Sequence, residues 1–335
     1  MSPPVTVSVI LTAFQRREFV RDAIESVMPA GEPTSETEVC LVTNLAASEL
    51  PPSLPRTVTV IRDLPQNGMG AWFRAGLEST HGDVVAFLDD DDTFAAGKVA
   101  SVRAEFAADP ELGFLHNGRT DFSGAGAPSA SGVPRTRAGA TLRVREGEKG
   151  PDAVERLWAE EAAFNSSSIS MRRSVFAPVL SDLGELEGGP GAFLLFAALA
   201  SPGTVVSDPR PLTRYRVHAG NQSPTTASGS LVRLRRGYRL AGTRIHDVRL
   251  TLAMVQRLRP SLHVRPLQRA LLRSEWLLRL GDPRLSRSGA DQLVRELWEE
   301  RRLGPTDPAL WAAALLGLVA PPWAGRMVRG AVNGP

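Results

Sequence analysis

The first half of the chain alternates short, apolar stretches with helix-like ones, and this alternation limits the fold more than any other feature. Residues 5–13 (VTVSVILTA) are β-branched and almost continuously apolar, which is typical of a strand buried on both faces. Residues 17–28 instead place apolar side chains at helical spacing. Further strands are expected at 37–44, 57–63 and 82–92, and further helices at 68–80 and 96–109. This order predicts an α/β fold with a mainly parallel, doubly wound, Rossmann-like sheet.

The second half of the chain changes character in two steps. Residues 123–150 are rich in Gly, Ala, Ser, Pro and Arg, which predicts a mobile surface loop or lid. Helices are expected at 153–164 and 191–200, and short strands at 204–208 and 211–217. From about residue 230 the pattern is helical and Arg-rich, without a strand signal. We therefore expect an α/β domain at 1–228 and a C-terminal α-helical extension at 229–335.

Composition excludes several classes of protein. With 335 residues, 42% of them hydrophobic and 22% charged, the chain is neither disordered nor a small disulfide-rich domain. Its single cysteine, Cys40, allows no intramolecular disulfide and lies in an apolar stretch typical of a core strand. The N-terminus lacks the pattern of a secretory signal, and the apolar run at 309–320 is shorter than the ~20 residues of a spanning helix. A cytoplasmic protein, soluble or peripheral at the inner membrane face, is expected.

The charge is unevenly distributed along the chain. Residues 231–335 contain 19 Arg and 8 acidic residues, although the net charge of the whole chain is only +3. A solvated helical face is the simplest explanation, and we expect no nucleic-acid partner. Four tryptophans of this region have the spacing of core or interface anchors, namely Trp276, Trp298, Trp311 and Trp323. Contact with a membrane surface and a homodimer through these helices are the two alternatives for a partner.

Four consecutive carboxylates, Asp89 to Asp92, follow the apolar stretch VVAFL. Adjacent carboxylates repel one another, and a divalent cation removes that repulsion because Mg²⁺ and Mn²⁺ prefer hard oxygen ligands. The alternative is an acidic cap for the helix that follows. Because ligands of doubly wound sheets bind beyond the carboxyl ends of the strands, the position of these residues favours a binding site.

Three segments together resemble the family 2 nucleotide-sugar-dependent glycosyltransferases, which have the GT-A fold. These are VSVILTAFQRREFVRDAIESV (7–27), GLESTHGDVVAFLDDDDTF (76–94) and PLTRYRVHAGNQS (211–223). Asp89–Asp91 matches the DxD motif of that family, and the last segment resembles the motif that closes its catalytic domain. The resemblance covers roughly residues 5–223 and implies that the domain at 1–228 is a glycosyltransferase catalytic domain.

The resemblance implies roles for individual residues. Asp91 lies where the family has its main metal-binding carboxylate, and Asp89 where it contacts the donor ribose and the metal. His218 occupies the place of a histidine that meets the metal or the diphosphate, and imidazole is a suitable ligand for Mn²⁺. Further donor-binding residues are expected at Thr12 and Phe14 near the nucleotide base, at Asp90, and at Arg74 and Arg216 facing the diphosphate.

The sequence departs from the family pattern at three places. Thr43-Asn44 stands where many relatives have an acidic pair that reads uracil, so Asn44 becomes the candidate contact to the base. Phe73-Arg74 stands where relatives often have an Arg-Asn pair. Gly191-Ala192 occupies the place of the Glu-Asp pair whose Asp is the general base, and neither residue can accept a proton.

The general base therefore has to come from elsewhere if the chain is active. Glu187 and Glu185 are the nearest candidates, and Asp121 or His116 are alternatives. The resemblance implies an inverting, hexosyltransferase-type enzyme that uses Mn²⁺ or Mg²⁺ and a nucleoside-diphosphate sugar, with a UDP-sugar favoured. The sequence does not identify the acceptor, which in similar enzymes is a polysaccharide, a lipid carrier, a peptide or a natural product. A non-catalytic sugar-nucleotide-binding or scaffold protein is the main alternative, and a nucleotidyltransferase ranks third because no glycine-rich phosphate loop follows the first strand.

Overall fold

The computed structural model describes residues 4–14, 18–28, 36–51, 54–55, 57–62, 64, 68–123, 133–134, 140–218, 230–301 and 308–329. The chain forms two compact units. The first contains Met1–Ala219 and Leu250–Val264, and the second contains Gly220–Arg249 and Arg265–Pro335. The predicted domain boundary at 228–229 lies outside the described residues.

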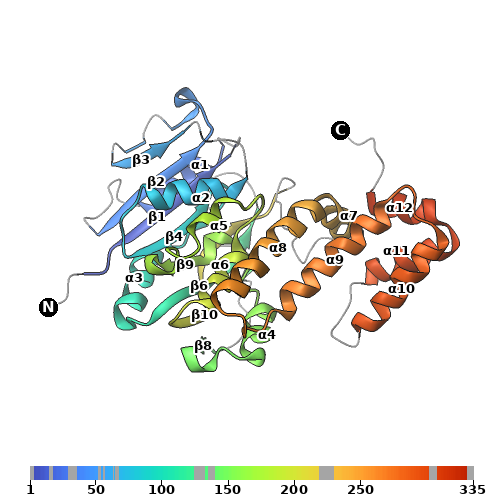
Figure 1. Cartoon of the computed structure of the whole chain (residues 1–335). Helices are drawn as coiled ribbons and strands as arrows, with labels where there is room; N and C mark the ends of the chain where they lie inside the picture. Colours follow the sequence, from blue (N-terminus) through green and yellow to red (C-terminus); the bar gives the residue numbers. More distant parts are fainter. Residues whose placement is uncertain are drawn as a thin grey trace. The chain divides into compact units, whose positions relative to one another are not determined.

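In the described residues the first unit is built on one mixed sheet (Figure 1). Its strands are β1 (Val7–Ala13), β2 (Thr37–Thr43), β3 (Val58–Ile61), β4 (Val84–Asp89), β5 (Thr93–Phe94), β6 (Leu112–Phe122), β7 (Val133–Pro134), β8 (Leu142–Val144), β9 (Ile169–Arg172) and β10 (Thr204–Arg216). The main path runs β3-β2-β1-β4-β9-β6-β10-β5. Strands β1 to β4 are mutually parallel, as are β6 and β10, whereas β9 runs antiparallel to both of its neighbours. The predicted mainly parallel α/β fold is confirmed.

The helices of the first unit connect these strands and cover the sheet. They are α1 (Val20–Val27), α2 (Met69–Glu78), α3 (Lys98–Ala108), α4 (Pro151–Ala159), α5 (Leu180–Gly184) and α6 (Gly191–Ala200), and the second half of α8 (Ala241–Leu258) also belongs to this unit. A short 3₁₀ turn, η3 (Ser166–Ser168), precedes β9. Val9 and Leu11 of β1 belong to one apolar cluster with Ile24 of α1 and Phe106 of α3. On the opposite face, Ile10 packs so closely against Gly76 of α2 that a Cβ there would clash. Alternate residues of β1 therefore serve cores on both faces, as its continuous apolar pattern predicts.

The carboxyl-terminal part of the sheet differs from expectation in two ways. The two short strands expected at 204–208 and 211–217 are a single strand, β10, which pairs with β6 through register shifts near Asp208 and Pro211. The expected loop at 123–150 ends in strand β8, which pairs with β10, and residues 124–132 and 135–139 lie outside the described residues. Pro209 and Pro211 interrupt the alternating pattern that is typical of a strand. The sequence therefore predicted two strands where the structure has one.

The second unit is helical in its described part. Its elements are α7 (Ser230–Arg239), the first half of α8 (Ala241–Leu258), α9 (Arg265–Gly281), α10 (Arg287–Arg301), α11 (Pro308–Val319) and α12 (Pro321–Arg329). Trp276 is buried in its apolar core, whereas the side chains of Trp298 and Trp323 are 54% and 61% exposed. Every helix in the described part of the chain is too short or too polar to cross a lipid bilayer.

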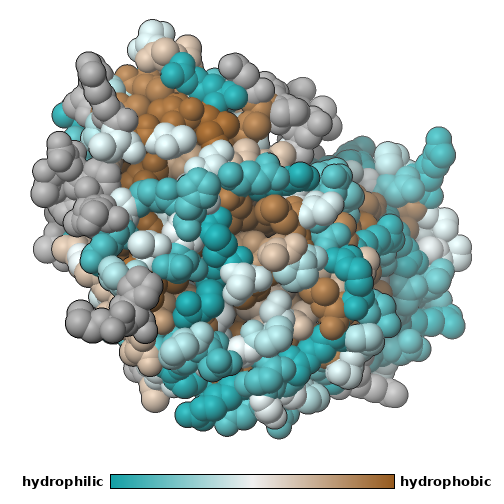
Figure 2. Space-filling model, turned by 60° about the vertical axis from the view of Figure 1, so that its left-hand side comes forward, coloured by the Kyte–Doolittle hydropathy of each residue, from teal (hydrophilic) through white to brown (hydrophobic). Residues whose placement is uncertain are grey.

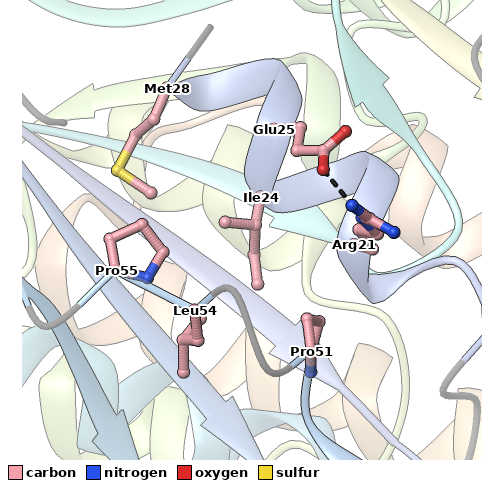
Figure 3. Close-up of a pocket in the computed structure, with 7 residues that line it drawn as sticks. All are labelled: Arg21, Ile24, Glu25, Met28, Pro51, Leu54 and Pro55. Carbon is pink, nitrogen blue, oxygen red and sulfur yellow. Dashed lines mark hydrogen bonds and ion pairs between the residues drawn. The ribbon is translucent and has the colours of Figure 1, made fainter. Parts of the chain in front are cut away.

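The surface of the described residues includes a crevice away from the predicted site residues. Figure 2 shows mixed hydrophilic and hydrophobic residues, with hydrophobic ones gathered near the top of the view. A crevice of about 220 Å³ lies between α1 and the segment before β3, lined by Arg21, Ile24, Glu25, Met28, Pro51, Leu54 and Pro55 (Figure 3). Arg21 and Glu25 form an ion pair along α1. None of the predicted site residues lines this crevice.

Candidate active site

The ends of β1 and β4 bring the first predicted site residues together. Thr12 and Asp89 are register partners on these neighbouring parallel strands, with Thr12 Oγ1 3.5 Å from Asp89 Oδ1. One residue further, the Asp90 amide donates to the Thr12 carbonyl at 3.0 Å, and the Phe14 amide donates to Asp90 Oδ2 at 3.2 Å. The two strand ends are therefore tied to each other at the carboxyl edge of the sheet, where the ligands of such folds bind.

The third carboxylate of the run meets the predicted histidine. Asp91 Oδ2 lies 2.9 Å from His218 Nε2, although the two residues are 127 positions apart in the chain. His218 follows the end of β10, and its ring packs beside Phe19 with 5.7 Å between the ring centroids. The sheet thus brings together Asp91 and His218, which the sequence analysis had related only through their resemblance to family motifs.

Arg216 is a structural residue here rather than a solvent-facing one. Its side chain is 1% exposed, with Nε donating to the Asp91 carbonyl at 2.8 Å and Nη2 paired with Asp22 at 2.9 Å. The guanidinium also lies over the rings of Phe19 and Phe122, at 4.2 and 4.5 Å from their centroids. The expectation that Arg216 faces a diphosphate is therefore corrected, because these contacts hold the guanidinium inside the protein under the carboxylate run.

Asp92, the last carboxylate of the run, is buried. Its side chain accepts from the Arg216 amide and from Asn165 Nδ2, both at 3.0 Å. Burial, together with the neighbouring carboxylates of Asp91 and Asp89, raises the pKa of Asp92 well above its ordinary value. The sequence analysis gave Asp92 no role of its own, and its role as a buried anchor comes from the tertiary structure.

A polar turn before β9 holds both ends of the carboxylate run, and sequence analysis missed it. Ser166 Oγ lies 2.9 and 2.8 Å from the two carboxylate oxygens of Asp89, and Ser167 Oγ accepts from the Asp89 amide at 3.0 Å. Asn165 contacts Asp92 as described above. The only local signal is the sequence NSSS immediately before a short strand, where hydroxyl and amide donors are concentrated.

Lys98 is a second residue that sequence analysis missed. It is 1% exposed and donates from Nζ to the Ser167 carbonyl and, at 2.9 Å, to Thr213 Oγ1. Its ammonium also lies 4.0 Å from the centroid of the Phe94 ring. Burial lowers the pKa of Lys98 well below its ordinary value, and the Asp92 carboxylate opposes that shift. Lys98 therefore joins the polar turn to β10 beneath the carboxylates.

The expected nucleotide-base side of the site lies at the ends of β1 and β2. Asn44 is exposed directly after β2, and the Thr43 hydroxyl donates to the Ala13 carbonyl at 2.9 Å. Phe14 is 41% exposed and meets the buried Trp72 edge to face, with 5.1 Å between the ring centroids. An exposed aromatic ring and an exposed amide thus follow adjacent parallel strands, at the same edge as the carboxylates.

Arg74, which is expected to face the diphosphate, lies on α2. Its Nε pairs with Glu78 at 2.8 Å along α2, and its side chain packs against Gly184 of α5. Nearly half of the Arg74 side chain is exposed. The contacts observed for Arg74 do not bring it to the carboxylate run.

At Gly191, the first position of the expected acidic pair, another part of the chain leaves no room for a side chain. Gly191 opens helix α6 and is buried, and a Cβ there would clash with the carbonyl oxygen of Ala163. Ala192 is half-buried. The segment that leads to the polar turn therefore lies where a side chain at 191 would begin, which gives a physical reason for glycine at this position.

The candidate replacement bases differ in their surroundings. Glu185 and Glu187 are exposed, and the Glu187 carbonyl accepts from the Met69 amide at 3.4 Å where α2 begins. His116 is buried with Nε2 3.0 Å from the Phe164 carbonyl, and burial lowers its pKa to about 4. Asp121 pairs with Arg119 at 3.2 Å. His116 is thus unsuited to take a proton from a solvent-facing substrate.

The polar side chains at this edge can hold a divalent cation only with help from a ligand. Among the described residues, no three His, Cys, Asp or Glu side chains converge as a ready-made metal cage. Asp91 and His218 are nevertheless in contact, with Asp89 two residues away on the same turn. A Mg²⁺-type ion usually takes one or two protein carboxylates and completes its shell with phosphate oxygens and water. The donor set therefore fits an ion that binds together with a diphosphate.

Comparison with solved structures supports the fold. Residues 1–349 of TarS from S. aureus superpose with a TM-score of 0.55 at 12% identity, covering 97% of this chain and 90% of that one. The same fragment in complex with UDP-GlcNAc superposes with a TM-score of 0.50 at 12% identity and the same coverage. A longer TarS structure gives 0.54 at 13% identity, but this chain covers 55% of its length. At this level of identity the likeness shows a shared GT-A fold.

The family follows from the sequence. No curated protein matches this chain significantly. The model of the family described as "Glycosyl transferase family 2" matches residues 8–177, which span β1, the carboxylate run and the polar turn before β9. That range is half of the chain and contains most of the predicted donor-side residues. The chain therefore belongs to glycosyl transferase family 2, whose members are enzymes that transfer a sugar from a nucleotide-sugar.

Proposed function

We propose that this chain transfers a sugar from a UDP-sugar to an acceptor hydroxyl, with inversion at the anomeric carbon and with a divalent cation, Mn²⁺ or Mg²⁺. The observation that carries the proposal is the contact between Asp91 and His218 beside Asp89, at the carboxyl edge of the sheet. The UDP preference rests on the likeness to TarS, which has been crystallised with UDP-GlcNAc and with UDP.

In this proposal the donor side binds and orients the nucleotide. Phe14 and Asn44, both exposed at adjacent strand ends, lie where a base would stack and form hydrogen bonds. Asp91, His218 and Asp89 would hold the cation, which neutralises charge on the leaving diphosphate. Arg216, Lys98 and the turn before β9 keep the carboxylates in place, so that little reorganisation is needed when the donor binds.

In this proposal the general base is a residue other than the acidic pair that the family has at the positions of Gly191 and Ala192. The acceptor oxygen bonds to the anomeric carbon as the bond from that carbon to the diphosphate breaks, and the acceptor proton passes to a carboxylate. We assign this role to Glu187, whose loop leads into α6 and whose backbone contacts the start of α2. Its exposed carboxylate is accessible to a substrate, whereas Glu185 is the second candidate on the same loop.

The test is a binding and turnover panel. UDP-, GDP-, dTDP- and CDP-sugars are titrated into the full chain with Mn²⁺, with Mg²⁺ and with EDTA, and release of free sugar is followed by chromatography. We expect metal-dependent binding of a UDP-sugar with slow hydrolysis. Absence of binding with every donor and metal would overturn the proposal.

A second candidate function has one observation in its favour. A side chain at Gly191 would clash with the Ala163 carbonyl, so the first acidic residue of the expected pair cannot be restored without moving that segment, and Ala192 carries no base at the second position. A protein that binds sugar nucleotides without transferring the sugar would tolerate that arrangement. Tight metal-dependent binding of a UDP-sugar, with neither hydrolysis nor transfer to any acceptor tested, would favour this non-catalytic function.

A further inference from the structure

We infer that Asn165, Ser166 and Ser167 are positioning residues that fix the carboxylates of Asp89 and Asp92 before the donor and its cation bind. The inference rests on the proposed function, because that function places Asp89 in the metal–diphosphate site, with Asp92 as the buried anchor of the same run. We call Asn165–Ser167 the polar turn. Its residues contact the site through other side chains, so their effect on the reaction is indirect.

The polar turn holds Asp89 by both its side chain and its backbone. The Ser166 hydroxyl lies within hydrogen-bond distance of both Asp89 carboxylate oxygens, at 2.9 and 2.8 Å. Ser167 Oγ accepts from the Asp89 amide at 3.0 Å. Two contacts from adjacent residues therefore restrict the backbone of Asp89 and the rotation of its carboxylate together.

The same turn holds the far end of the carboxylate run. Asn165 Nδ2 donates to Asp92 Oδ2 at 3.0 Å, while Asn165 Oδ1 accepts from the Ser167 amide at 3.0 Å. The first and the last carboxylates are thus bound to one turn, and Asp91 between them contacts His218 instead. The polar turn therefore fixes the orientation of the Asp89 carboxylate, and the contact between Asp91 and His218 lies beside it.

The polar turn is itself held rigidly. Asn165 has φ 62°, which is uncommon for a residue other than glycine and persists only where the surroundings impose it. The Ser167 carbonyl accepts from the buried Lys98 ammonium and, at 2.9 Å, from the Thr213 hydroxyl. The Ala163 carbonyl, two residues before the turn, fills the space beside Gly191. The turn is therefore held from β10 and from α3, and the segment before it packs against α6.

A fixed carboxylate binds a cation better than a mobile one. Side chains that order a metal ligand typically change metal affinity by about 10- to 100-fold when they are removed. The polar turn should therefore affect metal-dependent donor binding, and should affect binding without metal much less. A purely structural role would instead lower the stability of the protein without separating the two kinds of binding.

Ser166→Ala tests the inference, and Ser168→Ala is its matched control. Both serines lie in η3 and are buried, but the Ser168 hydroxyl has no hydrogen-bond partner among the described residues. UDP binding is measured by calorimetry on the full chain with Mn²⁺ and with EDTA, and the free energy of unfolding is measured by urea titration. We expect Ser166→Ala to weaken binding with Mn²⁺ by about tenfold or more, with little change in EDTA and with stability close to that of Ser168→Ala. Equal Mn²⁺-dependent binding by the two variants would overturn the inference.

Hydrogen exchange decides the matter even if no nucleotide binds. In the protein without ligands, the amides of residues 89–92 are followed by mass spectrometry in the wild type and in both variants. Faster exchange of these amides in Ser166→Ala than in Ser168→Ala supports the positioning role. Equal exchange overturns it. Absence of UDP binding in the wild type would overturn the proposed function, whereas equal hydrogen exchange in the two variants would overturn the positioning role. The two failures are therefore distinguishable.

Discussion

The donor side and the acceptor side of the candidate site are built in opposite ways. On the donor side, each carboxylate from Asp89 to Asp92 contacts a strand end, a histidine or the polar turn. On the expected acceptor side, the resemblance aligns Gly191 and Ala192 with the family's acidic pair, and the Ala163 carbonyl fills the space beside Gly191. Under the proposed function, the difference means that this chain keeps the residues that bind the donor and has changed the group that deprotonates the acceptor.

The largest effect is expected from Asp91→Ala, which breaks the donor side directly. Removing the carboxylate that contacts His218 should weaken metal-dependent UDP-sugar binding by on the order of 100-fold or more. Calorimetry with Mn²⁺ and with EDTA measures this loss. Asp182→Ala is the control, because Asp182 pairs with Arg257 away from the carboxylate run. Undiminished metal-dependent binding in Asp91→Ala would remove Asp91 from the metal site.

Gly191→Ala tests why the first position of the expected acidic pair is a glycine. The added Cβ would clash with the Ala163 carbonyl, so the free energy of unfolding should fall by about 2 kcal/mol. Gly189→Ala is the matched control, because a Cβ at Gly189 would meet nothing within 4 Å. Urea denaturation of the two variants provides the measurement. If both are as stable as the wild type, the close approach does not explain the glycine.

Glu187→Gln tests the replacement base and sharpens the contrast between the two sides. Turnover should fall at least about tenfold while the affinity for the donor stays the same, because a general base acts on the acceptor proton alone. Initial rates of sugar release or transfer, together with donor titrations, separate the two effects. Glu185→Gln on the same loop serves as the comparison. An unchanged rate in Glu187→Gln excludes Glu187 as the base.

The smallest effect concerns His116, the buried alternative. Because burial lowers its pKa from 6.5 to about 4, the folded protein binds this proton less readily than the unfolded chain. Stability is therefore lost as the pH falls from about 6.5 toward 4, by about 1 kcal/mol between pH 7 and 5.5. The free energy of unfolding of His116→Gln should therefore fall by about 1 kcal/mol less than that of the wild type between pH 7 and 5.5. The rates of this variant between pH 6 and 8 should follow the wild-type profile. A pH–rate profile that shifts in the variant would restore His116 as a candidate base.

Much of the fold could be predicted because its signals are local. The apolar strands β1, β2 and β4 and the helices α1, α2 and α3 follow from side-chain patterns within about ten residues, and each appears close to its expected bounds. Strands β6 and β9 were not expected. Strand β9 has four residues, which is too short for a period to show.

The sequence by itself determined the α/β class, the family and the place of the carboxylates after β4, because strand periodicity and motif order need no knowledge of distant neighbours. Only the tertiary structure decided what holds those carboxylates. Ser166 lies 77 residues from Asp89, and His218 lies 127 residues from Asp91. It also decided that Gly191 faces the Ala163 carbonyl. Contacts of this kind depend on which strand ends the sheet places side by side, and no local pattern of residues encodes that.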